Sequence, residues 1–106
     1  MKILPRDAQN LEVGGLRELA AANATHVRDT IRAALTPSVT RLDLDLSGVS
    51  FLDSSGLGAL IALHKSMLSQ GGVLRLLNPA PNVMQILELT RLHRVLEIVR
   101  TAGTGG

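Results

Sequence analysis

The chain has 106 residues, of which 45% are hydrophobic and 19% are charged, and its formal net charge is +2. This length and apolar content predict one compact domain with a core of its own. The absence of cysteine excludes disulfides, thiolate metal sites and cysteine nucleophiles, and a single phenylalanine without tyrosine or tryptophan leaves no platform for stacking bases.

The N-terminal third of the chain predicts a hairpin followed by a helix. Residues 2–4 are a short strand candidate, and residues 11–13 begin a second one after a polar turn. Across residues 20–35 the apolar positions recur at helical spacing, which predicts an amphipathic helix. Thr36-Pro37 ends this helix, because proline disfavours helical geometry in the residue before it.

The next segment, residues 40–46, alternates strictly between apolar and polar side chains. Such alternation predicts a strand with three leucines on one face and three charged residues on the other. Asp43 and Asp45 fall on the charged face, so we expect both to be solvated and not to act as an acid/base pair. One face of the sheet is therefore expected to be accessible to water.

Residues 57–68 are almost wholly apolar and predict the body of a second helix. It starts at the Asp53-Ser54-Ser55 cluster, and Gln70-Gly71-Gly72 closes it with the glycine that is common at a helix C-terminus. Three further elements follow: a strand at residues 73–77, a helix at residues 82–89 and a strand at residues 96–99.

This order of elements predicts an α/β fold with a mixed, mostly parallel β-sheet, a short N-terminal hairpin and three to four helices. The domain is expected to span residues 1–100, with a flexible tail at residues 101–106. The N-terminus lacks the apolar stretch of a signal peptide, and no apolar run is long enough to cross a membrane. Basic residues are spread from Lys2 to Arg100. We therefore expect a cytoplasmic protein with no membrane insertion and no nucleic-acid partner.

The most informative segment is the strand-to-helix turn that starts at Asp53. It presents the hydroxyls of Ser54 and Ser55 beside a helix N-terminus, where unpaired N–H groups and the helix dipole tolerate an added phosphate. The turn therefore suits the acceptance of a phosphoryl group. The alternative is that Asp53 or one of the serines only caps the helix. Gly56 and Gly58 are expected to leave the first turn sterically open.

Other kinds of chemistry fit the sequence less well. A serine hydrolase would need glycines on both sides of its serine, and a P-loop would need a lysine after its last glycine, but neither pattern is present. His26, His64 and His93 are far apart in the sequence and form no ligand pair at helical spacing. We interpret them as surface or partner-facing histidines, and we expect no metal, cofactor or enzymatic activity.

From Leu44 to Ile61 the sequence reads L-D-L-S-G-V-S-F-L-D-S-S-G-L-G-A-L-I, and G-G-V-L-R-L-L-N-P and I-L-E-L-T-R-L follow. In these motifs the chain resembles the STAS-domain anti-sigma factor antagonists of bacteria, from about Leu11 to Val99. The resemblance implies a STAS-like fold, phosphorylation of Ser54 by a cognate anti-sigma factor serine kinase, and a serine phosphatase that reverses it. It also implies that the partner binds at the turn itself, through Asp53, Ser54, Ser55, Gly56, Leu57 and Gly58.

The chain departs from the family in one motif. Members typically carry Gly-x-Leu-Asp at the end of the second strand, where this chain has Arg17-Glu18-Leu19-Ala20. An acidic wall of the partner site is then missing. Phe51, two residues before Asp53, is expected to anchor the turn in the aliphatic core.

The sequence thus predicts a switch protein, an anti-sigma factor antagonist that binds a kinase-type anti-sigma factor and is turned off by phosphorylation of Ser54. One alternative is a constitutive, non-phosphorylated STAS scaffold subunit of a transporter or stress-signalling complex. A third possibility, a binder of small molecules or lipids, would need a sizeable apolar pocket.

Overall fold

A computed structural model describes residues 1–101. The chain forms a mixed α/β fold, as the sequence pattern predicts. The elements of this part of the chain are β1 (Lys2–Pro5), β2 (Asn10–Gly14), β3 (Glu18–Leu19), α1 (Ala24–Ala34), β4 (Arg41–Asp45), β5 (Phe51–Leu52), α2 (Ser54–Ser69), β6 (Val73–Leu77), α3 (Pro81–Leu89), the 3₁₀ helix η1 (Leu92–Arg94) and β7 (Glu97–Val99).

The main sheet has five strands in the order β1-β2-β4-β6-β7. The strands β1 and β2 form an antiparallel hairpin, and every other pair in this sheet is parallel. This arrangement confirms the predicted mixed sheet with an N-terminal hairpin. The sequence pattern did not predict a second, two-stranded sheet, in which β3 pairs with β5 in parallel. Each of its strands has only two residues, too few for an alternation to be recognised.

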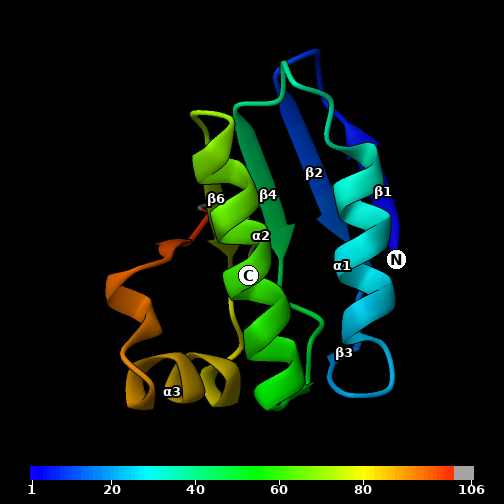
Figure 1. Ribbon diagram of the computed structural model, residues 1–106. Helices are drawn as coiled ribbons and strands as arrows, with labels where there is room; N and C mark the ends of the chain where they lie inside the picture. Colours follow the sequence, from blue (N-terminus) through cyan, green and yellow to red (C-terminus); the bar gives the residue numbers. More distant parts are fainter. Residues whose placement is uncertain (102–106) are drawn as a thin grey trace.

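Helices α1 and α2 lie side by side against one face of the main sheet (Figure 1). The core between these layers is almost entirely aliphatic, because leucine, isoleucine and valine fill both the inner sheet face and the facing helix stripes. The largest fully buried side chains include Ile31 on α1, Leu42 and Leu44 on β4, Leu60, Leu63 and Met67 on α2, and Leu74 and Leu76 on β6. No helix among residues 1–101 is both long and apolar enough to cross a membrane.

The prediction that Asp43 is solvated is wrong. Its side chain is only 10% exposed, and both carboxylate oxygens accept hydrogen bonds from Arg75, at 2.8 Å from Nε and 3.0 Å from Nη2. Arg41 adds an ion pair at 3.5 Å. Asp43 lies on the central strand, directly opposite Arg75 on β6, and the two arginine side chains cover it. The hydrogen bonding of Arg75 to Asp43, and then the attraction between their charges, hold the pKa of Arg75 above its usual range.

The ends of the helices follow local chemistry. Helix α2 ends as predicted, because Gly71 adopts a left-handed φ of +72° and the N–H of Gly72 bonds to the carbonyl of Met67. Helix α1 begins four residues later than the spacing predicts, at Ala24. Near the C-terminus, Thr101 hydrogen-bonds to Asn78, the residue that follows β6. Residues 102–106 of the predicted tail lie outside the described residues.

Candidate functional site

The carboxylate of Asp53 fixes the start of α2. Its Oδ1 accepts a hydrogen bond from the backbone N–H of Gly56 at 3.0 Å, which confirms the predicted helix cap. Its Oδ2 accepts a second bond, also 3.0 Å long, from the N–H of Ala21. The bonds from Gly56 and then Ala21 hold the pKa of Asp53 below its ordinary value. One ionised side chain therefore joins the turn before α1 to the start of α2.

The turn before α1 is held by the side chain of Asn23, which belongs to the turn itself. Asn23 accepts a hydrogen bond from the N–H of Ala20 at 2.9 Å and donates one to the carbonyl of Glu18 at 2.8 Å. Helix α1 starts late because these bonds keep residues 20–23 in a turn. The parallel pairing of β3 with β5 places this turn next to the start of α2. Backbone contacts thus set the relative position of the two segments.

Gly56 and Gly58 have different surroundings, so the structure requires glycine at only one of the two positions. A Cβ on Gly56 would collide with the carbonyl oxygen of Leu19 and would lie 2.6 Å from Cδ1 of Leu52. Gly56 is therefore required by the close packing of α2 on β3, so the prediction that it leaves the turn open is wrong. Around Gly58 no heavy atom lies within 4 Å of the Cβ position, and there the prediction holds.

The six residues predicted to form the partner site begin α2 or cap it, so the structure brings all of them together. Ser54, Ser55 and Gly58 are exposed, Asp53 and Leu57 are half-buried, and Gly56 is buried. The hydroxyl of Ser54, on the first residue of the helix, is thus presented to solvent beside an ionised, fixed carboxylate. This geometry gives an accessible nucleophilic oxygen on a rigid support.

A pocket of about 280 Å³ opens between the first turns of α1 and α2. Sequence reasoning missed its charged member, Arg28, since nothing in the helix pattern distinguishes it from the other arginine of α1. Arg28 donates from Nε to Asp29 at 2.9 Å. The lining residues are Ala24, Thr25, Arg28, Ser55, Gly58 and Ala59.

The single phenylalanine belongs to the surface. The expectation that Phe51 anchors the turn in the core is wrong, because its side chain is 56% exposed. On the two-residue strand β5, successive side chains point to opposite sides, and Leu52 takes the buried position. A large, exposed aromatic ring therefore lies two residues from the Asp53 cap.

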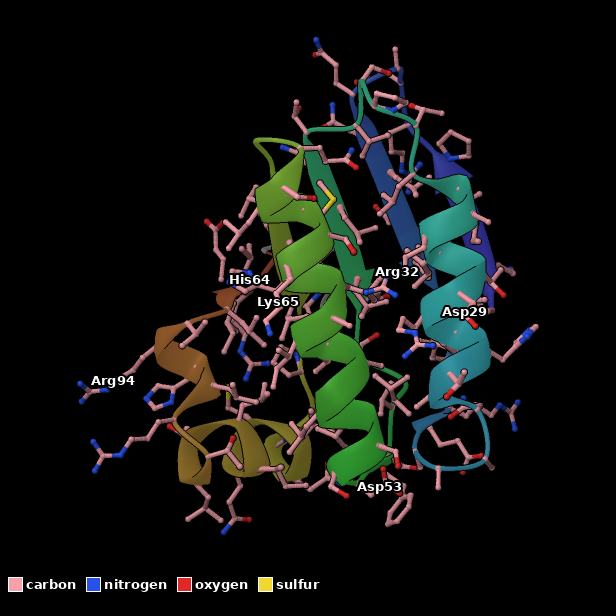
Figure 2. The ribbon with its side chains drawn as sticks, viewed as in Figure 1. Asp29, Arg32, Asp53, His64, Lys65 and Arg94 are labelled. Atoms are coloured by element: carbon pink, nitrogen blue, oxygen red, sulfur yellow. The ribbon has the colours of Figure 1, made fainter. Side chains whose placement is uncertain are left out.

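The histidines lie on different elements: His26 on α1, His64 on α2 and His93 on η1. Figure 2 shows Asp53 at the start of α2 and His64 with Lys65 farther along the same helix. Within residues 1–101, no group of three histidine, cysteine, aspartate or glutamate side chains could hold a metal ion.

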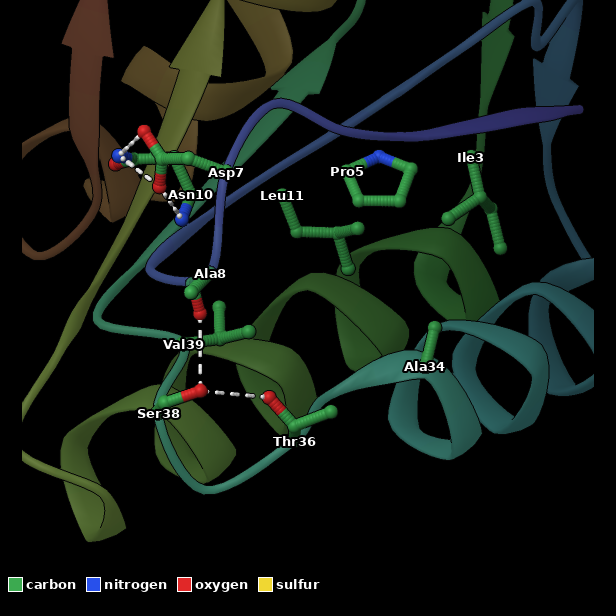
Figure 3. A pocket seen from close by; sticks show the side chains of 10 residues that line it. All are labelled: Ile3, Pro5, Asp7, Ala8, Asn10, Leu11, Ala34, Thr36, Ser38 and Val39. Carbon is green, nitrogen blue, oxygen red and sulfur yellow. Dashed lines mark hydrogen bonds between the residues drawn. The ribbon is translucent and has the colours of Figure 1, made fainter.

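A larger pocket, of about 400 Å³, lies between the N-terminal hairpin and the C-terminal end of α1 (Figure 3). Its lining includes the apolar side chains Ile3, Pro5, Leu11, Ala34 and Val39. The polar groups at its edge bond among themselves: Asp7 accepts from Asn10, and Ser38 bonds to Thr36 and to the carbonyl of Ala8. None of the residues predicted for the partner site lines this pocket.

The Asp53 cap makes a testable contribution to stability. Asp53→Ala removes both acceptors and is expected to lower the thermal midpoint by several degrees at pH 7. Because folding lowers the pKa of Asp53, its stabilisation is complete above the carboxyl's unfolded pKa, about 3.9, and is lost as the pH falls through the folded value. The difference in midpoint between wild type and variant should therefore shrink between pH 5 and pH 2 in calorimetric scans.

Asp53→Asn is the matched control. Its amide offers only one acceptor oxygen for the two N–H groups of Gly56 and Ala21, so we expect an intermediate midpoint. Its amide does not titrate, so its own contribution should stay constant with pH. A wild-type advantage over Asp53→Ala that persists undiminished at pH 2 would contradict the role of the ionised cap.

Comparison with known proteins shows which domain family the chain matches. The sequence model of the STAS domain matches residues 15–105. An anti-sigma-B factor antagonist from Listeria monocytogenes is 26% identical over 103 residues, which cover 97% of this chain and 90% of that protein. A crystal structure of a candidate anti-sigma factor antagonist from Thermotoga maritima is 27% identical, with a TM-score of 0.87 over 95% of this chain and 86% of that chain. The murine anion transporter Slc26a9 is 26% identical, with a TM-score of 0.73 over 83% of this chain but 15% of the transporter chain.

Proposed function

Because the chain belongs to the STAS domain family, we propose that it is an anti-sigma factor antagonist that is switched by phosphorylation of Ser54. In the unmodified state it binds a kinase-type anti-sigma factor, which then releases its sigma factor. Its relatives support this role, since the Listeria protein, which matches over nearly the whole chain, is named an anti-sigma-B factor antagonist. The domain acts as a cytoplasmic binding partner and not as an enzyme.

The observation that carries the proposal is the fixed start of α2. Asp53 is held through two backbone N–H groups, and Ser54 follows it with an exposed side chain. In the proposed reaction, Oγ of Ser54 attacks the γ-phosphorus of ATP bound to the kinase, and ADP leaves. The hydroxyl proton passes to a base of the kinase, which also supplies the metal ion. This chain contributes only the acceptor oxygen.

The proposed docking surface surrounds this hydroxyl. It comprises the small, exposed residues Ser54, Ser55 and Gly58, the half-buried Leu57, and the exposed ring of Phe51. Small residues let a partner backbone approach closely, and an aromatic ring supplies a large contact area with few rotatable bonds. Phe51 is therefore added to the partner-binding residues that the sequence predicts.

Phosphorylation turns the surface off by electrostatics. A phosphate adds a charge of about −1.5 to −2 at pH 7. Next to the ionised Asp53, this charge must be desolvated when a partner surface closes over it, which disfavours the complex. A separate serine phosphatase removes the group and restores binding.

The proposal is tested with the anti-sigma kinase of the source organism. Incubation with ATP is expected to give one phosphate, located at Ser54 by mass spectrometry and absent from Ser54→Ala. In calorimetry, Ser54→Ala should keep wild-type affinity, whereas Ser54→Asp should bind at least about tenfold more weakly.

Ser69→Asp is the control, because it adds the same charge to an exposed serine at the opposite end of α2. It should leave the affinity unchanged. Equal affinities of Ser54→Ala and Ser54→Asp would contradict the switch, as would a phosphate that persists in Ser54→Ala.

The comparisons also support a second candidate function, that of a constitutive scaffold subunit in a transporter complex. The murine anion transporter carries a segment of this fold within a much longer chain, and Ala20 stands where antagonists typically have aspartate. A scaffold would bind its partner equally well as Ser54→Ala and as Ser54→Asp, and the kinase would not modify it. The same two measurements therefore separate the candidates.

A further inference from the structure

The pocket between α1 and α2 combines one guanidinium with two hydroxyls. Arg28 and Thr25 line it from α1, and Ser55 lines it from α2. Gly58 also borders the pocket, and no heavy atom lies within 4 Å of where its Cβ would be. A cation, two hydroxyl donors and open space above a bare backbone are the features that suit a phosphate group.

Arg28 is free to change partners. Its bond to Asp29 joins neighbouring residues on the helix surface, and the two side chains are 35% and 58% exposed. Ion pairs exposed to this degree contribute little to stability. A phosphate dianion, in contrast, can accept two parallel hydrogen bonds from one guanidinium. Arg28 can therefore leave Asp29 for a phosphate at little cost.

Ser54 is placed to deliver such a phosphate. It precedes Gly58 by four residues, so the two positions are neighbours on the same side of α2. Ser54 is also the direct neighbour of Ser55, which lines the pocket, and helix side chains lean toward the N-terminus, so a group on Ser54 lies beside the N-terminal end of the pocket. The carboxylate of Asp53 is fixed by the N–H groups of Gly56 and Ala21, so it does not move into the pocket to pair with Arg28.

We propose that the α1–α2 pocket is a phosphate-monoester site, in which Arg28 and the hydroxyls of Thr25 and Ser55 bind the phosphate carried by Ser54. This inference rests on the proposed function, because it takes Ser54 as the modified residue. The bound phosphate occupies part of the pocket, so the surface offered to a partner changes in shape as well as in charge. A free phosphate ester has the same chemistry, and the experiment separates the two sources.

The test uses the full chain with phosphoserine introduced at position 54 during translation, so it needs no kinase. The titration of the phosphate is followed by phosphorus NMR in the wild-type background and in Arg28→Gln. A guanidinium favours the dianion, so the titration midpoint in the wild-type background should lie roughly one pH unit below that of Arg28→Gln. Identical midpoints would overturn the proposal.

Arg32→Gln is the matched control, because Arg32 lies one turn farther along α1, bonds to Ser66 at 3.1 Å and does not line the pocket. Its midpoint should equal that of the wild-type background. The other charged or titratable groups of this region are Asp29 and His26 on α1 and Asp53 at the start of α2. Imidazole groups titrate in the same range as a phosphate, so the three proteins are also compared in a His26→Gln background.

The unmodified chain is then titrated with phenyl phosphate, and the amide signal of Ser55 is followed by NMR. Saturable binding that Arg28→Gln abolishes, together with identical phosphoserine midpoints, would overturn Ser54 as the source and assign the site to a free ester. If the midpoints are identical but phosphorylation still abolishes partner binding, the pocket assignment fails and the proposed function stands. If the midpoint depends on Arg28 but phosphorylation does not weaken partner binding, the pocket assignment stands and the proposed function fails.

Discussion

Gly56→Ala is expected to destabilise the domain by about 3 kcal/mol, although it adds only one methyl group. The new Cβ would collide with the carbonyl oxygen of Leu19 and approach Cδ1 of Leu52 to 2.6 Å. The Leu19 contact is to backbone that pairs with Leu52 in the β3–β5 sheet, so Leu19 cannot move away without disturbing this small sheet. Urea unfolding followed by circular dichroism measures the loss.

Gly58→Ala is the matched control, two residues farther along the same helix. No heavy atom lies near its Cβ position, and alanine favours a helix over glycine by about 1 kcal/mol. We expect this variant to be as stable as the wild type or more so. If Gly56→Ala unfolded at the same urea concentration as Gly58→Ala, the close packing of α2 on β3 would be refuted.

Arg75→Met is expected to cost about 2 to 3 kcal/mol, because it leaves the carboxylate of Asp43 buried beside Arg41 alone. The carboxylate is only 10% exposed and loses both of its hydrogen bonds to Arg75. The estimate is below that for a fully buried pair, since Arg41 still lies 3.5 Å away. Chemical denaturation at pH 7 measures the cost.

The double variant Asp43→Leu/Arg75→Met is expected to recover most of this loss, because it removes the unpaired charge and fills the space with apolar atoms. Asp43→Leu alone should cost less than Arg75→Met, since the side chain of Arg75 is 24% exposed and can turn to solvent. Additive effects of the two single changes would show that the side chains do not interact.

Periodic patterns allowed much of the fold to be predicted. In the helices α1 and α2 and the strand β4, apolar side chains recur at regular spacing over several residues, and a glycine marks the end of α2. The mostly parallel character of the sheet follows from the same pattern, because strands that are joined by helices pair in parallel, whereas the strand order itself came from the structure. The start of α2 was also predictable, since an aspartate before a helix has one strongly preferred use, as a cap.

What the sequence did not predict depends on neighbours that are distant along the chain. Asp43 is buried because Arg75, 32 residues later, lies opposite it on β6. Phe51 is exposed because Leu52 takes the inner position of a strand too short to show a pattern. Arg28 resembles the other basic residue of an amphipathic helix until α2 is placed beside it. Alternation and spacing describe one element at a time and carry no information on these contacts.

The way the turn before α1 is held has a consequence for its tolerance of substitution. Ala21 and Ala22 are exposed, while the position of their backbone is set by Asp53 and Asn23. Substitutions at these two side chains can therefore change the surface beside the start of α2 without disturbing the backbone of the turn. Under the proposed function, Ala21 and Ala22 are positions next to the docking surface where the side chain can vary while the support of Ser54 stays the same.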